Sequence, residues 1–414
     1  MPPAIHQVPF ADPPWLRGAP SPYFNASHRR FQAACRQFVD ENLNKNALDW
    51  ETAEEVLSNL FEVFAKGNFI LPSLPAPLPV PVEEWDTLHT MIYADEMSRS
   101  GLAGPPGSIT TGVAFGIPPL LHYAEPQLQE RFLPDLLVGR KRICIAITEP
   151  DAGSDVANIT TTATLSGNEY IINGTKNMAV RTGGENSRGK GISLILVPLK
   201  DHPGVIRRRL KVTGQIVAGT SFIELDDIRV PRENLIGREN EGMKYIIHNF
   251  NHERMFISVG VTRQARVALS SAFAYCLQRK AFNKTLMEQP VVRHRLAKCG
   301  AILEAQWSWV ESFAYQLSKM PKETADQELG GLTALCKANA GIVLDECARC
   351  AVLLFGGNGY MHTSKGEIAE KIYREVPGAR IPGGSEDVLL DLAIRQLTKQ
   401  FRAQLAKETT QAKI

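Results

Sequence analysis

The sequence predicts an α+β fold that is mostly helical, with an N-terminal helical domain over residues 1–142, a central antiparallel β domain over 143–240 and a C-terminal four-helix bundle over 241–414. Three observations support this fold. Apolar residues recur at helical spacing in the first third, short β-branched runs occupy the middle, and long helical stretches fill the last third. The 414 residues, 44% of them hydrophobic, are enough for two or three domains with buried cores.

Helical spacing dominates the N-terminal region. Apolar residues lie at positions i, i+3, i+4 and i+7 in two sets. These sets are Phe31, Ala34, Cys35 and Phe38, then Leu57, Leu60, Phe61 and Phe64. We expect a helix around each set, a proline-rich connector at 71–81, and a helix over 85–97. A loop at 101–108 then precedes two more helices.

Short runs rich in β-branched residues replace this pattern from residue 143 onward. Two tracts, Ser166-Gly167-Asn168 and Asn173-Gly174, carry residues that accept positive φ in hairpin turns. The segment therefore predicts an antiparallel sheet. The expected strands cover 143–147, 160–165, 169–172, 192–197 and 221–225.

Helical spacing returns after residue 237 in long stretches. Short connections separate these stretches, which is typical of a helix bundle. The expected helices cover 241–280, 290–320, 331–354 and 387–407.

Charge and hydropathy exclude several classes of protein. With 46 Lys and Arg against 44 Asp and Glu, the net charge is +2, and no long block of one sign offers a surface to nucleic acid or to an anionic membrane. The longest apolar runs are far shorter than the ~20 residues of a membrane helix, so we expect no membrane span.

Cysteine usage and the chain ends bear on localisation. Seven scattered cysteines favour a reducing intracellular compartment. Cys347 and Cys350 form a C-x-x-C pair in an apolar helical stretch without a second pair, which favours core packing over redox or metal chemistry. The proline-rich N-terminus makes a mitochondrial transit peptide less favoured. The tail Ala412-Lys413-Ile414 resembles a degenerate peroxisomal import signal, although an arbitrary tail is equally compatible.

Four tracts place hydroxyl groups, charges or glycines together. They cover 148–155, 279–282, 355–360 and 381–387. In the second tract, Arg279 can bind a pyrophosphate, and Phe282 shares its helical face three residues on. The last tract leads into a helix N-terminus that can hold an anion. Each also has an ordinary structural interpretation, either a turn capped by Ser154 or Asp155 or a solvated helix end.

Glu253 and Arg254 place adjacent opposite charges in an apolar helical stretch. A carboxylate in an apolar cleft has a raised pKa that suits a general base, whereas an exposed helical glutamate is the commoner case. The histidines show no zinc-ligand spacing, and neither a G-x-S-x-G elbow nor a dinucleotide-binding fingerprint is present. No metal site is predicted.

Taken in order, these tracts resemble the acyl-CoA dehydrogenase family over roughly residues 30–400. The resemblance implies FAD bound between the β domain and the bundle, in homo-oligomers, usually tetramers, whose neighbouring subunit completes the cofactor site. The contacts from Arg279 to Gly357 would reach the FAD of that neighbour. The full set of implied FAD contacts is Ile147, Thr148, Gly153, Ser154, Arg279, Phe282, Gln289, Gly356, Gly357, Ser385 and Asp387.

The implied reaction is α,β-dehydrogenation of an acyl-CoA thioester, in which a carboxylate removes the α-proton and FAD accepts the β-hydride. Many family members carry the base where this sequence has Gly383. The isovaleryl and long-chain branches carry it on the first bundle helix, directly before an arginine. Glu253 matches that arrangement and is the predicted base, with Arg254 and Ser154 at the substrate. The expected substrate is a medium, branched or unusual acyl-CoA, in fatty-acid or specialised-metabolite biosynthesis.

One region departs from the family. After Asn173-Gly174-Thr175-Lys176 the family continues into a Trp-Ile-Thr-Asn-Gly strand against the flavin, but here Asn177 and Met178 follow directly. Leu353 replaces a common Gln, and Asn283 a common Gly. We therefore expect the chain to lack one strand of the flavin site, through a real deletion or a gene-model error.

Electrons would pass to an electron-transferring flavoprotein or to oxygen. Two alternatives to a dehydrogenase stay open on the sequence alone. One is a related flavin oxidase, and the other is a degenerate, flavin-free acyl-thioester binding or scaffold protein.

Overall fold

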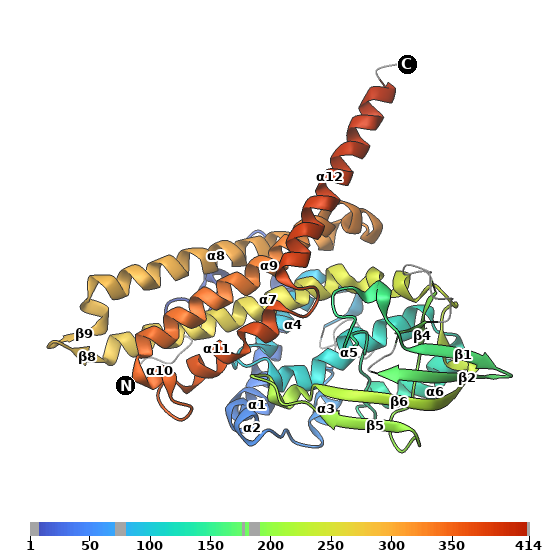
Figure 1. Ribbon diagram of the computed structural model, residues 1–414. Helices are drawn as coiled ribbons and strands as arrows, with labels where there is room; N and C mark the ends of the chain where they lie inside the picture. Colours follow the sequence, from blue (N-terminus) through green and yellow to red (C-terminus); the bar gives the residue numbers. More distant parts are fainter. Residues whose placement is uncertain (1–7, 71–79, 176–178, 182–190, 412–414) are drawn as a thin grey trace.

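Helices, a sheet and further helices follow one another along the chain in the computed structural model (Figure 1). The structure describes residues 8–70, 80–175, 179–181 and 191–411. The predicted class, mostly helical α+β, is confirmed. Two predictions lie outside the described residues: the tail Ala412-Lys413-Ile414, and the direct continuation from Lys176 into Asn177 and Met178.

Six α-helices cover most of the N-terminal region among the described residues. Helices α1 and α4 pack against each other, and each begins with a capping box. The predicted helix around 57–64 begins only at Leu60, which leaves Leu57 outside it and 51% exposed. The helices are α1 (Ala26–Asn42), α2 (Ala47–Ala53), α3 (Leu60–Lys66), α4 (Thr87–Met97), α5 (Gly104–Tyr123) and α6 (Pro126–Leu137).

A seven-stranded sheet forms the middle region. Its order is β5-β6-β2-β1-β3-β4-β7, and all neighbours are antiparallel except β1 and β3, which pair in parallel at one position. Gly167, at φ +61°, makes the predicted turn between β1 and β2. The strands are β1 (Thr162–Ser166), β2 (Glu169–Thr175), β3 (Ala179–Arg181), β4 (Ile192–Ile195), β5 (Val205–Arg209), β6 (Ser221–Pro231) and β7 (Leu235–Ile236).

Two predictions in this region are wrong. Asn173-Gly174 is no hairpin turn, because it lies inside β2, where the pairing with β6 shifts register. Gly174 has φ +146°, and a Cβ atom there would lie 2.7 Å from the Thr161 Cα, so the irregularity needs a glycine. Residues 143–147 form no strand, since the backbone instead runs against α5. A Cβ atom on Gly112 would lie 1.8 Å from the Ile143 carbonyl oxygen.

Long helices form the C-terminal region, as predicted. Helices α7, α8, α9 and α11 share one apolar core that includes Leu269, Leu303, Leu344 and Ile372. Helix α11 is an element the sequence interpretation missed. The helices are α7 (Gly242–Gln278), α8 (Pro290–Lys319), α9 (Lys322–Phe355), α10 (Gly357–Tyr360), α11 (Glu367–Arg380) and α12 (Glu386–Gln411), with a small hairpin of β8 (Lys280–Ala281) and β9 (Lys284–Thr285) after α7.

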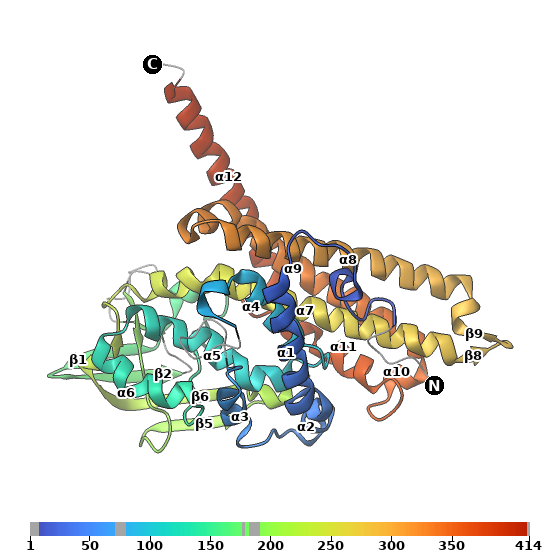
Figure 2. The same cartoon turned by 180° about the vertical axis from the view of Figure 1, so that it is seen from behind.

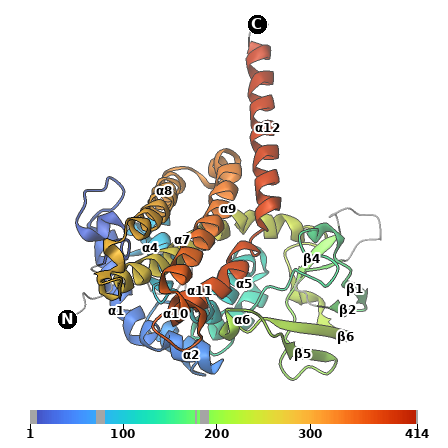
Figure 3. The same ribbon diagram turned by 60° about the vertical axis from the view of Figure 1, so that its left-hand side comes forward.

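The last long helix only partly joins the bundle. The first half of α12 packs on α9, where Leu389 and Ala393 contact Ala334 and Ala338. Its second half projects away from the rest of the chain (Figures 1 and 3). Among the described helices, none has the length and apolar character needed to cross a bilayer.

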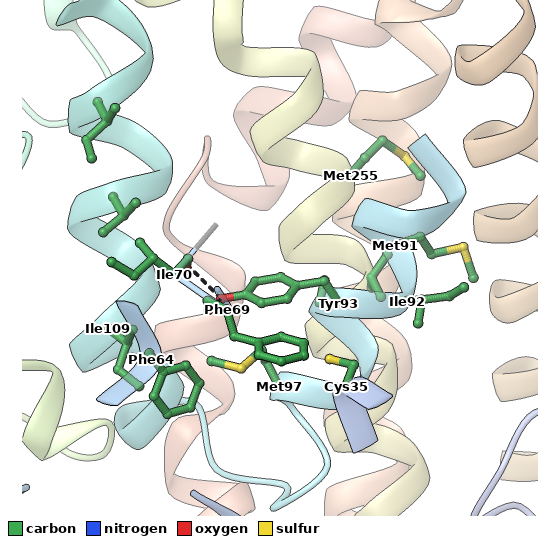
Figure 4. Packing of buried hydrophobic residues seen from close by; sticks show 14 of the residues in the cluster. Cys35, Phe64, Phe69, Ile70, Met91, Ile92, Tyr93, Met97, Ile109 and Met255 are labelled. Carbon is green, nitrogen blue, oxygen red and sulfur yellow. Dashed lines mark hydrogen bonds between the residues drawn. The ribbon is translucent and has the colours of Figure 1, made fainter. Parts of the chain in front are cut away.

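Helix α7 is anchored in the N-terminal region, which lies behind it in Figure 1 and in front in Figure 2. The Arg263 Nε atom donates to Asp95 of α4 at 2.6 Å, with both side chains buried. Beside this ion pair, the hydroxyl of buried Tyr93 donates to the carbonyl oxygens of Phe69 and Ile70 at 2.9 and 2.8 Å (Figure 4). The ion pair joins α7, the helix that carries Glu253, to α4, and the Tyr93 bonds join α4 to the segment before it.

Candidate active site

Glu253 and Arg254 both lie buried in α7, with 8% and 7% of their surfaces exposed. This excludes the interpretation of Glu253 as an ordinary exposed helical glutamate. The Arg254 Nε atom donates to the Gly383 carbonyl oxygen at 3.4 Å. Burial lowers the pKa of Arg254, and the neighbouring Glu253 opposes that shift. A carboxylate and a guanidinium at adjacent positions of α7 are therefore both buried away from bulk water.

The loop that ends in α12 lies directly against this pair. Gly383 has φ +70°, and a Cβ atom there would lie 2.8 Å from Cδ1 of Ile257, one helical turn after Glu253. The position that carries the base in many relatives thus contacts the helix that carries Glu253 here. In this chain the loop position accepts glycine without strain, and a side chain there would displace Ile257.

A second buried cation holds the same loop. The Lys337 Nζ atom on α9 donates to the carbonyl oxygens of Gly384 and Arg380 at 2.8 and 3.0 Å. Burial, followed by the charge of Arg254, lowers the pKa of Lys337 to about 8. Sequence reasoning missed Lys337. Its only signal was a lone lysine between apolar residues within the predicted helix 331–354.

The turn at 148–155 is also built around a buried charge. The Glu149 side chain, 3% exposed, accepts from the Thr160 amide at 2.6 Å and from the Thr161 amide at 3.0 Å. Its backbone pairs with that of Ala152. This fixes the turn to the start of β1. It leaves the predicted FAD contacts Thr148, Gly153 and Ser154 exposed and Ile147 half-buried. Sequence reasoning missed Glu149, although it lies within the tract at 148–155.

The predicted capping roles in this turn do not apply. Asp155 precedes a short 3-10 helix but makes no side-chain cap to its backbone. Its carboxylate instead accepts from the Asn158 side chain at 2.5 Å. Nothing lies within 4 Å of a Cβ atom built on Gly153, so the backbone there is open to close approach.

Five predicted FAD contacts lie together at the far end of the bundle. The Tyr275 ring contacts the Phe355 ring at a tilt of 34°, with centroids 4.5 Å apart, and its hydroxyl accepts from the Asn358 side chain at 3.2 Å. These contacts join the end of α7 to the segment after α9. We call these five residues the hairpin group: Arg279, Phe282, Gln289, Gly356 and Gly357.

One prediction about this end is wrong. Phe282 does not share a helical face with Arg279, because α7 ends at Gln278. Phe282 and Asn283 instead form the turn of the β8–β9 hairpin, at φ +54° and +60°. Phe282 is 92% exposed there.

The chain does not assemble all predicted cofactor contacts in one place. The hairpin end of the bundle and the sheet lie at opposite sides of the molecule in both Figure 1 and Figure 2. Ser385 and Asp387 lie at the start of α12, next to the loop that Arg254 holds, and the Ser385 carbonyl oxygen accepts from Leu389 at 2.9 Å. One chain thus brings Glu253, Arg254 and Ser385 into one area but leaves the hairpin group apart.

A different buried carboxylate, Glu375 on α11, also has a perturbed pKa. Burial raises the pKa of Glu375 to about 8. Its oxygens accept from the Ala103 amide at 2.8 Å, the Gln264 side chain at 2.7 Å and the Gln215 amide at 3.3 Å. It borders a pocket of about 200 Å³ between α2, the 214–216 loop and α11. Because three donors from different regions engage it, we assign Glu375 to holding those regions together.

One cluster has the composition of a metal site. One ligand atom each of His28, Asp86 and His89 lies within 4.8 Å of the others. Both rings, however, accept a backbone N–H through Nδ1, His28 from Asn25 at 3.0 Å and His89 from Asp86 at 3.2 Å. Against the effect of burial, hydrogen bonds with the two rings hold the pKa of Asp86 well below its usual range. The cluster is explained by the capping of α1 and α4.

Three family models match successive parts of the chain. They describe the acyl-CoA dehydrogenase N-terminal domain at residues 25–140, the middle domain at 144–228 and the C-terminal domain at 240–398.

Known proteins match over nearly the whole length. Acyl-CoA dehydrogenase apdG of Emericella nidulans is 61% identical, over 97% of this chain and 98% of the relative. The mouse mitochondrial long-chain specific acyl-CoA dehydrogenase is 28% identical, over 90% of this chain and 87% of the relative. The crystal structure of an acyl-CoA dehydrogenase from Geobacillus kaustophilus is 27% identical, with a TM-score of 0.80 over 91% of this chain and all of that chain.

The alignment with the Emericella protein is longer than this chain. It runs over 431 positions, whereas the chain has 414 residues, so the relative contains residues that this chain lacks. The expected loss of a strand after Lys176 falls on residues outside the described part of the chain and stays a prediction.

Proposed function

The chain belongs to the acyl-CoA dehydrogenase family, and we propose that it dehydrogenates an acyl-CoA thioester between the α and β carbons, with FAD as cofactor and Glu253 as base. Family membership itself makes the protein an oxidoreductase acting on acyl-CoA. The residue roles, the precise cofactor and the assembly are the proposal.

The observation that carries the proposal is the buried Glu253-Arg254 pair against the Gly383 loop. Removal of an α-proton requires a carboxylate whose environment disfavours its charge. Glu253 is buried in α7, and Arg254 secures the adjacent loop through the Gly383 carbonyl oxygen. Glycine at 383 provides no carboxylate of its own, so Glu253 takes that role from the neighbouring helix.

The residues present fit a flavin. Thr148 and Ser154 expose hydroxyl donors on a turn that Glu149 fixes in place, and a Cβ atom on Gly153, Gly356 or Gly357 would meet nothing within 4 Å. Bound FAD would supply the hydride acceptor for the β-carbon. The chain's own groups bind and orient the two reactants and hold the α-proton on Glu253.

We also propose a homo-oligomer. The candidate FAD contacts at the hairpin end are separated from the turn at 148–155, so a second copy is needed to bring the two groups to one cofactor. Helix α12 supports this, because exposed apolar side chains follow one of its faces from the half that packs on α9 into the half that projects. These exposed residues are Leu390, Ile394, Phe401 and Leu405. Light scattering coupled to gel filtration measures the assembly, and a monomer that retains FAD would contradict it.

The test of the base is the bleaching of bound FAD by acyl-CoA. We expect Glu253→Gln to slow bleaching by about 10²–10⁴-fold, the range that a general base contributes. Glu323→Gln is the matched control, because Glu323 is an exposed carboxylate in the first turn of α9. A Glu253→Gln protein that bleaches at the unmodified rate would overturn the assignment.

The same preparation separates the alternatives. Rapid reoxidation by air with release of peroxide identifies a flavin oxidase, whereas dependence on an electron-transferring flavoprotein identifies a dehydrogenase. Protein without flavin absorbance, even after addition of FAD, identifies a flavin-free binding protein. A series of acyl-CoAs of graded length defines the substrate. The peroxisomal prediction is tested by deleting Ala412-Lys413-Ile414 from a fluorescent fusion and following its location in cells.

A further inference from the structure

The C-x-x-C pair on α9 has a third cysteine beside it. The sequence interpretation assigned Cys347 and Cys350 to core packing because no second pair accompanies them. In the structure, Cys299 of α8 packs into the same buried cluster. The three thiols are 6% (Cys299), 0% (Cys347) and 7% (Cys350) exposed.

The two helices approach closely at this point. The Cys347 Sγ atom lies 3.9 Å from the Cys299 carbonyl oxygen, and the Cys299 Sγ atom lies 3.7 Å from the Glu346 carbonyl oxygen. Each thiol thus reaches the backbone of the opposite helix. A disulfide needs Cα atoms only about 4.4–6.8 Å apart, a separation that closely packed helices can provide.

The three thiols differ in acidity. Hydrogen bonding with Cys347 and Cys350 lowers the pKa of Cys299, and the positive charges of Lys298 and Arg295 act in the same direction. The same hydrogen bonds, together with burial, raise the pKa values of Cys347 and Cys350. The thiolate is the reactive form of cysteine, so this difference supports Cys299, the one cysteine of the three on α8, as the first to react.

We propose that Cys299 is an oxidation site that forms a disulfide with Cys347 or Cys350 and thereby links α8 to α9. The oxidant is hydrogen peroxide. The Cys299 thiolate attacks one peroxide oxygen, the O–O bond breaks, and a sulfenic acid and one water result. The second thiol then attacks the Cys299 sulfur, an S–S bond forms, and the sulfenic oxygen leaves as a second water. Two thiols lose two electrons and two protons in total, and one peroxide is reduced to two waters.

The proposed disulfide would lie near the end of α9. Cys350 lies five residues before Phe355, the last residue of α9, after which Gly356 and Gly357 follow. This separation is about one and a half helical turns. The link would therefore stiffen the end of the bundle that carries the hairpin group.

The test treats the purified full-length protein with hydrogen peroxide and maps its peptides by mass spectrometry without reduction. We expect a cross-linked peptide pair containing Cys299, two hydrogens lighter than the reduced pair, and a higher melting temperature in the oxidised than in the reduced protein. Cys299→Ser abolishes both changes. The double variant C347S/C350S abolishes them as well, and each single variant identifies the partner.

Cys144→Ser is the matched control, because Cys144 is exposed and forms no disulfide with another part of the chain. This variant should cross-link as the unmodified protein does. Absence of a Cys299 disulfide at a peroxide concentration that fully oxidises Cys144 would overturn the proposal. The same holds for a disulfide that excludes Cys299. Neither readout uses acyl-CoA turnover, so this result and the test of Glu253 are independent.

Discussion

Two loops at the candidate site are each fixed by buried charge, but the charges have opposite sign. The turn at 148–155 is held by the Glu149 carboxylate, which accepts backbone N–H groups at the start of β1. The loop at 381–385 is held by Lys337 and Arg254, which donate to backbone carbonyl oxygens. One loop presents its carbonyl oxygens to cations from two helices, whereas the other carries a carboxylate that accepts from amides outside the turn.

The difference follows from what each loop must expose. The first turn leaves the hydroxyls of Thr148 and Ser154 in the open, and its buried anchor comes from within the turn itself. The second loop lies on a helix surface, so its anchors come from α7 and α9, far away in sequence. One buried charged side chain that makes several hydrogen bonds can therefore fix a whole loop. Within the part of the chain that the structure describes, no buried charge anchors the hairpin turn at Phe282, whose side chain is 92% exposed.

The largest expected effect is the loss of the anionic anchor. Glu149→Gln replaces one carboxylate oxygen by an amide that cannot accept from the donors of Thr160 and Thr161. We expect the free energy of unfolding to fall by about 3 kcal/mol, because hydrogen bonds to a charged acceptor are lost and buried donors stay unsatisfied. Urea unfolding measures this, with Asp151→Asn, an exposed carboxylate of the same turn, as control. Equal stability of the two variants would remove Glu149 from its anchoring role.

Loss of a cationic anchor is expected to cost less. Lys337→Met leaves the carbonyl oxygens of Arg380 and Gly384 without a donor but also removes a buried charge that Arg254 repels. The lost hydrogen bonds destabilise the fold, whereas removal of the buried charge stabilises it. We expect the free energy of unfolding to fall by about 2 kcal/mol at neutral pH. Lys399→Met, on the exposed surface of α12, serves as the control in the same unfolding experiment. An increase in stability would show that the desolvation of Lys337 outweighs its hydrogen bonds.

A smaller effect is expected from backbone strain in the same loop. Gly383→Ala places a Cβ atom at φ +70° and 2.8 Å from Cδ1 of Ile257. We expect the free energy of unfolding to fall by about 1–2 kcal/mol and the KM for acyl-CoA to rise. Gly153→Ala is matched to it in the other loop, because nothing lies within 4 Å of that Cβ, and its stability should not change. If neither alanine variant changes the free energy of unfolding, the Gly383 loop is not packed against α7.

The cationic anchor also predicts a pH dependence. The folded pKa of Lys337, about 8, lies below its ordinary value of 10.5, so the unfolded chain binds the proton more tightly between these values. Stability should therefore rise with pH in this window, by at most about 1.4 kcal/mol per pH unit. Subtracting the curve of Lys337→Met from that of the unmodified protein isolates this contribution. A flat difference between about pH 8 and pH 10 would contradict it.

Local sequence patterns predicted most of the elements but not their ends. Helices α7, α8 and α9 were predicted because apolar residues recur at a short helical period. The strand predicted at 143–147 was wrong, because a short apolar run shows no periodicity. It therefore does not distinguish a strand from an extended segment that packs on a helix. Gly174 failed for a related reason, because a glycine serves a strand irregularity as well as a turn.

The candidate site was only partly accessible to the same reasoning. Glu253 was found because the motif around it is local in sequence. Lys337 and Glu149 were missed, because a charged residue in a motif or helix gives no sign of which backbone groups it will meet.

The sequence by itself determined the order of the helical, sheet and helical regions, the absence of a carboxylate at Gly383 and the adjacent charges in α7, because each depends on residues within a few positions of one another. Tertiary structure alone decided that Gly383 lies beside that pair, 129 residues away from Arg254 in the chain, and that Cys299 reaches the C-x-x-C helix. It also decided that the hairpin contacts lie apart from the turn at 148–155. Contacts between residues far apart in the chain depend on how whole helices pack. The local periodicity of apolar residues carries no information about that packing.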